Sequence, residues 1–444
     1  MKKLALFWLL FLLTGILIWI FFQPPYSLKE AETFLQVSYV ARVPGYIKEL
    51  PQTSLLYKAY ILGLGFLYKL IALFKLNFLS LPVLRLVSLV LFLTGISVLV
   101  SLFSIPLSET SLALVLGVVS CYSVLFSICT LSPLPGIWAL CFLIAWSLFC
   151  SDEARALKYL SFLFLAIGIF LFPFLFLTLW VSLFITSLIF RKTSVLKTMF
   201  SPQGLALFVG CEVFLFACWR YFFGSFPKIT PLHLTPKEVF SLIPILLKKR
   251  TLLELAPFVV LFVMAPLGLI LNTLKKKEPG EATIPGYLLI ALGLFVILSL
   301  FSGLKNLHHG FVFLLPFLVL LMVGIVERAL SSRVILFVIL VWSILSCGFY
   351  FGKTFYYGEK LRYRIGIMET ALSKVDKTFA CFWKSYNPLI AHYFTKRVKL
   401  IKFPQMLKGC RVVISPERIE GYSVKGVFLD PYSKKLWYVL ETKP

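Results

Sequence analysis

The sequence predicts a polytopic α-helical membrane protein that carries a small α/β domain outside the bilayer. Of its 444 residues, 60% are hydrophobic and only 14% are charged, a balance that soluble domains do not have. Apolar segments long enough to cross a bilayer recur up to about residue 351. The remaining segment is polar and alternates short apolar strands with helical runs. We therefore expect a transmembrane module over residues 1–352 and a soluble domain over residues 353–444.

The apolar segments predict about eleven spans. The first span, 4–22, follows Met1-Lys2-Lys3 and precedes no small-residue cleavage site, which is typical of a signal anchor with its N-terminus in the cytoplasm. The run 158–190 is too long for one pass, and Pro173 near its middle predicts two short helices that meet at a break. The other predicted spans are 81–103, 110–128, 134–150, 204–224, 255–274, 284–302, 310–327 and 333–351.

The charge pattern supports this orientation. With the N-terminus inside, the tight cytoplasmic loops hold several basic residues, including the Lys275-Lys276-Lys277 triplet, as the positive-inside rule requires. The outer loops are basic too. This indicates either an anion site or tolerance of positive charge in longer loops, which follow the positive-inside rule only weakly. The formal net charge of +25 falls between apolar spans, so it suits membrane phosphates and argues against a nucleic-acid partner.

The first outer loop, residues 23–80, is the one long polar insertion in the first half of the chain. Its pattern predicts an amphipathic helix that ends at Arg42, a turn at Pro44-Gly45-Tyr46, and a second helix from Ser54 to about Leu76. A pair of amphipathic helices directly after the first span makes this loop the first place to look for a functional site.

Two carboxylates, Glu30 and Glu32, lie at the start of the first of these helices. Because they are two residues apart, they do not share a helical face, and we expect only one of them to point into a site. The alternative is that both are first-turn acids favoured by the helix dipole, with Ser27 as the N-cap.

Cationic side chains on the outer side form a second candidate group. Arginine at a membrane boundary suits bidentate binding of phosphate, and its commoner alternative role is to reach lipid headgroups. One short outer loop adds two adjacent histidines, which suit proton handling or a phosphate contact unless the loop is a solvated turn. The candidates are Arg42, Arg85, Arg220, Lys305, His308 and His309.

The sequence signals no cofactor and no metal. It has no Walker loop, no G-x-G-x-x-G after a strand, no G-x-S-x-G and no zinc motif, and adjacent histidines lack the spacing that one zinc ion requires. Glu212 lies inside the span 204–224, where an acid is costly. We expect it to be either a functional residue or a structural hydrogen-bond partner.

The polar tail predicts a small α/β domain. Cys381 and Cys410 lie in it and can pair if the tail faces an oxidising compartment. The other cysteines lie in or beside apolar segments and are expected to be small core residues. The predicted helices are 361–374 and 388–397, and the predicted strands are 378–383, 398–403, 411–415 and 435–441.

Six short segments, taken in order along the chain, form a recognisable pattern. They are Lys29-Glu30-Ala31-Glu32, Ala41-Arg42-Val43-Pro44-Gly45-Tyr46, Leu50-Pro51-Gln52-Thr53-Ser54-Leu55-Leu56-Tyr57, Leu84-Arg85-Leu86-Val87-Ser88, Lys305-Asn306-Leu307-His308-His309-Gly310 and the tail segment 386–394. The pattern resembles the GT-C superfamily of membrane glycosyltransferases, in particular its protein mannosyltransferase and aminoarabinose transferase branch. Two positions depart from the family pattern. Lys29 stands where the family has the aspartate proposed as catalytic base, and Ser132-Pro133-Leu134-Pro135 has no acid where a second family acid often stands.

The resemblance implies sugar transfer with inversion at the outer face of the cytoplasmic membrane. An acceptor hydroxyl or amine on a lipid, glycan or protein attacks the anomeric carbon of a sugar held on a polyprenyl phosphate, and the lipid phosphate leaves. Such a site needs a carboxylate that takes the proton, for which Glu30 is the first candidate and Glu32 the second. It also needs cations that hold the departing phosphate, for which the six basic residues named above are candidates.

Two other functions are compatible with the same sequence. The chain fits a catalytically silent relative that binds lipid-linked sugar or a partner enzyme, and the Lys29 departure favours this alternative. It also fits a polytopic transporter or flippase. Transporters built from inverted repeats show paired broken helices in two halves, however, whereas this sequence predicts one broken run and a C-terminal outer domain.

Overall fold

The structure is a computed structural model, and the chain forms two compact units in it. The helical unit consists of residues 1–16, 47–60 and 85–350, and the sheet unit consists of residues 17–46, 61–84 and 351–444. The structure describes residues 1–24, 27–48, 55–76, 80–102, 108–150, 155–223, 249–274, 284–301, 310–376, 378–385, 387–391, 394, 399–401, 407 and 409–442.

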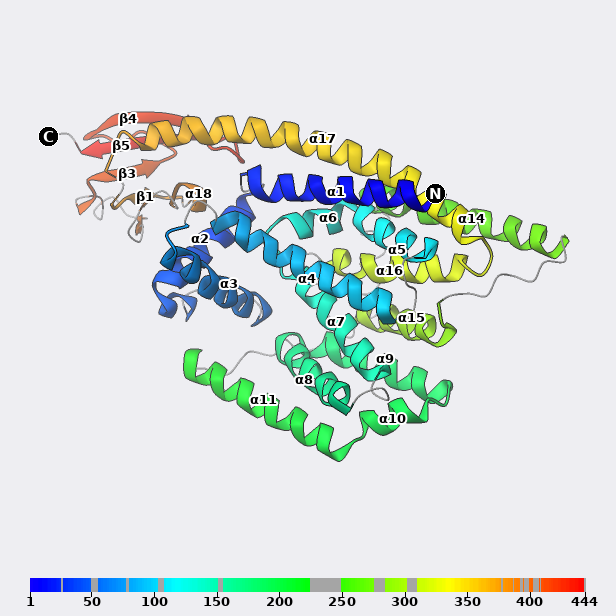
Figure 1. The fold of residues 1–444 in the computed structure, drawn as a ribbon. Helices are drawn as coiled ribbons and strands as arrows, with labels where there is room; N and C mark the ends of the chain where they lie inside the picture. Colours follow the sequence, from blue (N-terminus) through cyan, green and yellow to red (C-terminus); the bar gives the residue numbers. More distant parts are fainter. Residues whose placement is uncertain are drawn as a thin grey trace. The chain divides into compact units, whose positions relative to one another are not determined.

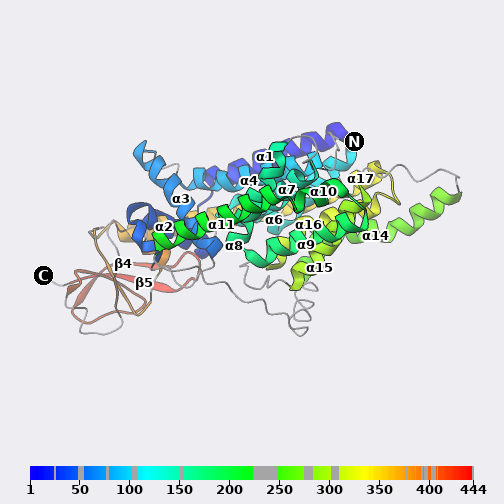
Figure 2. The same ribbon diagram turned by 90° about the horizontal axis from the view of Figure 1, so that it is seen from below.

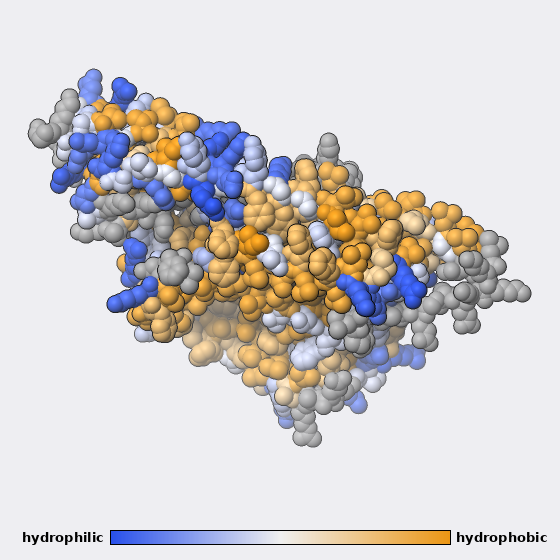
Figure 3. Space-filling model, turned by 45° about the horizontal axis from the view of Figure 1, so that its top comes forward, coloured by the Kyte–Doolittle hydropathy of each residue, from blue (hydrophilic) through white to orange (hydrophobic). Residues whose placement is uncertain are grey.

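The helical unit is built from apolar helices that lie roughly alongside one another (Figure 1 and Figure 2). Apolar side chains cover much of the helical surface, whereas hydrophilic residues gather near the sheet (Figure 3). Across the described chain, six helices are long and apolar enough to cross a membrane, or seven if the bent pair α5 and α6 is one span, and five shorter apolar helices accompany them. A multi-pass helical membrane protein is thereby confirmed, while the count of about eleven spans stays a prediction.

Most of the helices that lie wholly or partly in this unit were expected from the apolar segments, and α3 was expected as the second helix of the first outer loop. The short α10, the division into α5 and α6, and the length of α17 were not expected. The helices that lie wholly or partly in the unit are α1 (Lys2–Phe22), α3 (Leu55–Leu73), α4 (Ser80–Leu102), α5 (Glu109–Ser120), α6 (Tyr122–Cys129), α7 (Leu134–Phe149), α8 (Arg155–Leu171), α9 (Pro173–Ile189), α10 (Thr193–Met199), α11 (Pro202–Phe223), α14 (Lys249–Leu274), α15 (Gly286–Phe301), α16 (Gly310–Val326) and α17 (Ser332–Leu372).

Two apolar stretches of this unit are broken, and the sequence predicted one of the breaks. The run 158–190 divides at Phe172, with Pro173 at the first position of α9, because proline cannot donate the backbone hydrogen bond that would continue α8. The stretch 110–128 was expected to be one helix, and that expectation is wrong. Here α5 and α6 meet at Cys121 with a bend of 77°.

Polar contacts support the bend between α5 and α6, which contains no proline. The Ser123 hydroxyl donates a hydrogen bond to Glu254 Oε1 on α14 at 2.7 Å, and the Cys121 thiol lies 3.9 Å from the Glu254 backbone oxygen. Glu254 is only 4% exposed. A carboxylate beside the first turn of a helix interacts favourably with its dipole, so Glu254 stabilises the start of α6.

Close packing holds the helices of this unit together. A Cβ atom at Gly95 of α4 would lie 3.0 Å from the Cα of Ala139 on α7, so only glycine allows these backbones to approach as they do. The indole nitrogen of Trp138 donates to the backbone oxygen of Phe313 at 2.9 Å. The Phe295 ring meets that of Phe317 edge-on, with ring centroids 5.0 Å apart.

The sheet unit contains a five-stranded mixed sheet in the order β2-β1-β3-β5-β4. The strand β1 is parallel to both β2 and β3, while β5 is antiparallel to β3 and β4. Figure 1 shows the sheet beside the C-terminal end of α17. The remaining elements of this unit are α2 (Leu28–Arg42), the 3₁₀ helix η1 (Pro44–Lys48), β1 (Cys381–Trp383), α18 (Pro388–Ala391), β2 (Lys399–Ile401), β3 (Val412–Ser415), β4 (Tyr422–Leu429) and β5 (Leu436–Thr442).

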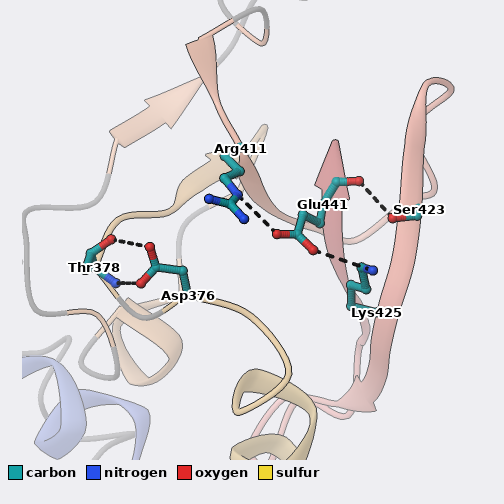
Figure 4. Close-up of polar contacts among 6 residues, drawn as sticks. All are labelled: Asp376, Thr378, Arg411, Ser423, Lys425 and Glu441. Atoms are coloured by element: carbon teal, nitrogen blue, oxygen red, sulfur yellow. Dashed lines mark hydrogen bonds and ion pairs between the residues drawn. The ribbon is translucent and has the colours of Figure 1, made fainter. Parts of the chain in front are cut away.

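The edge strand β4 was not predicted from the sequence. Its register against β5 shifts between Val424 and Gly426, and such a bulge disrupts the two-residue alternation by which strands are recognised. The Glu441 carboxylate of β5 pairs with Arg411 at 3.2 Å and with Lys425 of β4 at 3.6 Å (Figure 4). These ion pairs, together with the backbone ladder, fix the edge of the sheet.

The helix α17 is one element of 41 residues, about 60 Å long, where the sequence predicted a span 333–351 and a separate helix 361–374. Polar residues after residue 351 end the apolar pattern but do not end the helix. Beyond it, Cys381 and Cys410 form a disulfide, with Cα atoms 6.0 Å apart. The pairing that the sequence allowed is thus present in the structure.

Candidate functional site

The helix α2 carries the candidate carboxylates, and one of its faces belongs to the core of the sheet unit. Ala31 and Leu35 are buried in a hydrophobic cluster with residues of α17, α18 and the sheet, and Tyr39 packs against this cluster. The apolar positions i, i+4 and i+8 therefore anchor the helix to a rigid scaffold.

A second face of α2 packs against α3. A Cβ atom at Gly65 of α3 would lie 3.1 Å from Val40 Cγ1 and 3.5 Å from the Val37 backbone oxygen, so the glycine allows the two helices to come close. The ring of Phe34 meets that of Tyr68 edge-on, with centroids 6.0 Å apart. With two faces fixed in this way, the side chains at the start of α2 are held in defined positions.

The two acids of α2 differ in burial, as their spacing predicts. Glu30 is 3% exposed, whereas Glu32 is exposed. The Ser27 hydroxyl accepts a hydrogen bond from the Glu30 backbone N–H at 3.1 Å, so Ser27 is the N-cap that the sequence suggested. Because an acid in the first turn also gains from the helix dipole, part of the stabilisation of Glu30 is structural.

Lys29 precedes Glu30 and is half-buried. Burial lowers the pKa of Lys29 from 10.5 to about 8, and the neighbouring Glu32 carboxylate opposes that shift. The Lys29 amine therefore loses its proton more readily near neutral pH than the amine of an exposed lysine. The position that departs from the family pattern thus holds an amine that titrates near physiological pH.

The basic candidates lie in different surroundings. Arg42 is exposed in the last turn of α2, where the helix dipole favours a cation. Arg85, near the start of α4, is completely buried. Three residues further on, the Ser88 hydroxyl donates to the Ser132 backbone oxygen at 3.3 Å, which links the Leu84–Ser88 motif to the segment where a second family acid often stands. Arg220 is exposed in the last turn of α11, a position that also suits contact with lipid headgroups.

The structure groups Glu30, Glu32 and Arg42 on one helix of the sheet unit, and it places Arg85 and Arg220 in the helical unit. Lys305, His308 and His309 lie outside the described residues. In the ranges that the structure describes, no three His, Cys, Asp or Glu side chains lie together in a way that could hold a metal ion.

Glu254, Glu327 and Gln36 are among the buried polar residues that were not picked out from the sequence. Glu254 supports the bend at Cys121, and Glu327 accepts a hydrogen bond from the Thr110 hydroxyl at 2.8 Å. Both lie at the ends of apolar stretches, which is the signal that could have found them. The third is Gln36 of α2, 8% exposed, whose side-chain oxygen has no hydrogen-bond partner among the described residues.

Comparison with known proteins defines the class of fold. No protein-family model and no curated protein matches the chain. Two crystal structures of ArnT from Cupriavidus metallidurans resemble it along its whole length. The apo structure covers 98% of this chain and 97% of its own, with a TM-score of 0.65 and 10% identity. The structure bound to undecaprenyl phosphate covers 98% of both chains, with a TM-score of 0.66 and 10% identity.

The chain therefore has a fold like that of ArnT over nearly its whole length. This likeness of fold agrees with the resemblance to GT-C membrane glycosyltransferases that the sequence motifs indicated. At 10% identity this likeness defines the fold and leaves the chemistry to be argued from the residues.

Proposed function

We propose that the protein is a glycosyltransferase that moves a sugar from a polyprenyl-phosphate donor to a lipid, glycan or protein acceptor. The observation that carries the proposal is the ArnT-like fold over 98% of the chain, combined with a buried carboxylate, Glu30, at the start of the outer-loop helix α2. One of the two structural neighbours holds undecaprenyl phosphate, which supports a polyprenyl-linked ligand here.

In this proposal Glu30 is the general base. Its carboxylate accepts the proton from the acceptor hydroxyl or amine while the acceptor atom bonds to the anomeric carbon, and the bond from that carbon to the lipid phosphate oxygen breaks. Glu32 is the alternative base, although its exposure makes it the weaker candidate. Proton transfer by a positioned side chain contributes roughly 10²–10⁴-fold to a rate.

The departing phosphate carries negative charge that cations must stabilise. Arg85 is the first candidate because its guanidinium is fully buried, where an electrostatic interaction is stronger than in water. Arg42, Arg220, Lys305, His308 and His309 remain further candidates for phosphate contacts. We include no metal in this scheme.

We place the reaction at the outer face of the cytoplasmic membrane. The disulfide between Cys381 and Cys410 supports this placement, because disulfides persist in oxidising compartments such as the bacterial periplasm. The sheet unit, which contains both this disulfide and α2, would then face away from the cytoplasm.

Transfer in reconstituted liposomes tests the proposal. The liposomes contain undecaprenyl phosphate that carries radiolabelled mannose, glucose or aminoarabinose, and a membrane lipid and protein extract serves as acceptor. We expect label to move to the extract in step with the release of undecaprenyl phosphate. Donor that is bound but never consumed would instead identify a catalytically silent binder, and donor that crosses the bilayer intact would identify a flippase.

A further inference from the structure

One side of α2 carries polar residues that are buried or half-buried. Lys29, Thr33 and Gln36 occupy positions i, i+4 and i+7, which share one side of a helix. Lys29 is half-buried, Thr33 is 2% exposed and Gln36 is 8% exposed. We call these three residues the α2 stripe. Its polar side chains differ from the apolar ones that pack against the sheet unit's core, and Val40, four residues after Gln36, continues the same side of the helix and contacts Gly65 of α3.

Gln36 is the member of the α2 stripe whose hydrogen-bonding capacity is left unused. Its Oε1 atom is buried and accepts no hydrogen bond from any described residue. Thr33, by contrast, donates its hydroxyl proton to the Lys29 backbone oxygen at 2.9 Å. A buried polar atom without a hydrogen-bond partner destabilises a folded protein. Such an atom therefore needs an explanation, and one explanation is that it accepts a hydrogen bond from a ligand.

The chemistry of the unused atom restricts the ligand. A carboxamide oxygen only accepts hydrogen bonds, so the group that meets it must be a donor. The phosphate of a polyprenyl-phosphate sugar is a diester that is ionised at neutral pH and offers acceptors alone. A sugar hydroxyl, or an amine on the sugar, offers the donor that Oε1 lacks.

We propose that Gln36 binds the sugar of the lipid-linked donor, with Oε1 accepting a hydrogen bond from a sugar hydroxyl or amino group. This inference rests on the proposed function, in which Glu30 of the same helix is the base. Gln36 lies six residues after Glu30, about 9 Å along the helix axis and about 120° around it. In this proposal Gln36 holds the sugar, while Glu30 takes the proton from the acceptor that attacks it.

The variant Gln36→Met tests this inference because methionine nearly matches glutamine in size and removes the unsatisfied amide. Binding is measured in nanodiscs with two probes, the undecaprenyl phosphate sugar that wild type binds most tightly and undecaprenyl phosphate without a sugar. We expect the Kd of the sugar-bearing lipid to rise roughly fivefold to tenfold, the effect of one lost hydrogen bond. The Kd of the bare lipid should stay within about twofold, and the Tm of the ligand-free protein should rise or stay level.

Gln203→Met is the matched control, because the Gln203 side chain is exposed and its oxygen already accepts a hydrogen bond from the Tyr159 hydroxyl at 3.0 Å. It should leave the Kd values of both lipids unchanged. Equal weakening of both lipids by Gln36→Met, a lower Tm, or no change in the Kd of the sugar-bearing lipid would each overturn the inference while leaving transfer by the wild type intact. If wild type neither binds nor consumes any sugar-bearing lipid, the proposed function fails together with the inference.

Discussion

In the helical unit, the buried carboxylates of Glu254 and Glu327 each accept a hydrogen bond from a hydroxyl group on another helix, whereas on α2 the buried oxygen of Gln36 accepts none from the described residues. Each of the first two residues joins its segment to another helix through one hydrogen bond at Oε1. The third is held on a well-packed helix with its acceptor unused. Burial of a polar side chain therefore does not identify a site, and the more informative question is whether the protein itself satisfies the group.

The two units also differ in covalent support, and this difference gives the largest expected effect on stability. Replacing Cys381 and Cys410 together by serine opens a crosslink with a sequence separation of 29. We expect the sheet unit to lose about 3–4 kcal/mol of stability, because the unfolded chain gains conformational freedom. Hydrogen exchange of β1 and β3 measures the loss. Cys211→Ser, at a free cysteine of the helical unit, is the control. Unchanged protection of β1 and β3 would show that the disulfide does not stabilise the sheet.

We expect a smaller loss of stability from the substitution Glu254→Ala. The substitution leaves the partly buried Ser123 hydroxyl without this acceptor and removes a carboxylate from the start of α6, so we expect a destabilisation of about 1–3 kcal/mol. Thermal unfolding in detergent measures the change. A Tm equal to that of wild type would mean that Glu254 is not used structurally, and the contrast with Gln36 would then disappear.

Glu212 on α11 also tests the contrast between polar groups that the protein satisfies and those that it does not, and here we expect the substitution to raise stability. Both of its carboxylate oxygens are buried and have no hydrogen-bond partner among the described residues. Glu212→Leu removes this unsatisfied group, and we expect stability to rise by roughly 1 kcal/mol with sugar transfer retained. If transfer is lost while the Tm rises, Glu212 belongs with Gln36 among the groups kept for function.

The smallest expected effect is the pH dependence due to Lys29. Because its pKa is lowered from 10.5 to about 8, the unfolded chain binds more protons than the folded chain between these pH values, and stability rises with pH across this window. The Tm of wild type should therefore increase relative to that of Lys29→Met between pH 7.5 and 10, by a modest amount because Lys29 is only half-buried. Lys374→Met, at an exposed lysine, is the control. A constant difference would show that folding leaves the pKa of Lys29 unshifted, and a difference that falls with pH would show that folding raises it; either result would contradict this prediction.

Much of the fold was predictable because lipid imposes strong constraints on sequence. Apolar length identified the membrane helices, and Pro173 located one break. The bend at Cys121 was missed because side chains from a distant helix support it, and no proline signals it. The strand β4 was missed because a bulge interrupts the alternation of its side chains. The helix α17 was predicted as two helices because the end of its apolar pattern was interpreted as the end of the helix.

The candidate site was predictable only in part. Spacing indicated that one of Glu30 and Glu32 would face inward, but the choice of Glu30 depends on how α2 packs against the sheet unit and α3. Likewise, Arg85 and Arg220 are similar in sequence context, yet one is fully buried and the other exposed. Gln36 was passed over because its significance lies in a missing partner, which only a three-dimensional structure reveals.

The central claim is that Glu30 on α2 acts as the base of a sugar transfer, and single-turnover transfer by Glu30→Gln tests it most directly. The substitution keeps the size of the side chain and removes the group that takes the proton. We expect turnover to fall roughly 10²–10⁴-fold with the Kd of the lipid-linked sugar within about twofold of wild type, while Glu32→Gln retains most of its activity. Turnover by Glu30→Gln at the wild-type rate would contradict the claim.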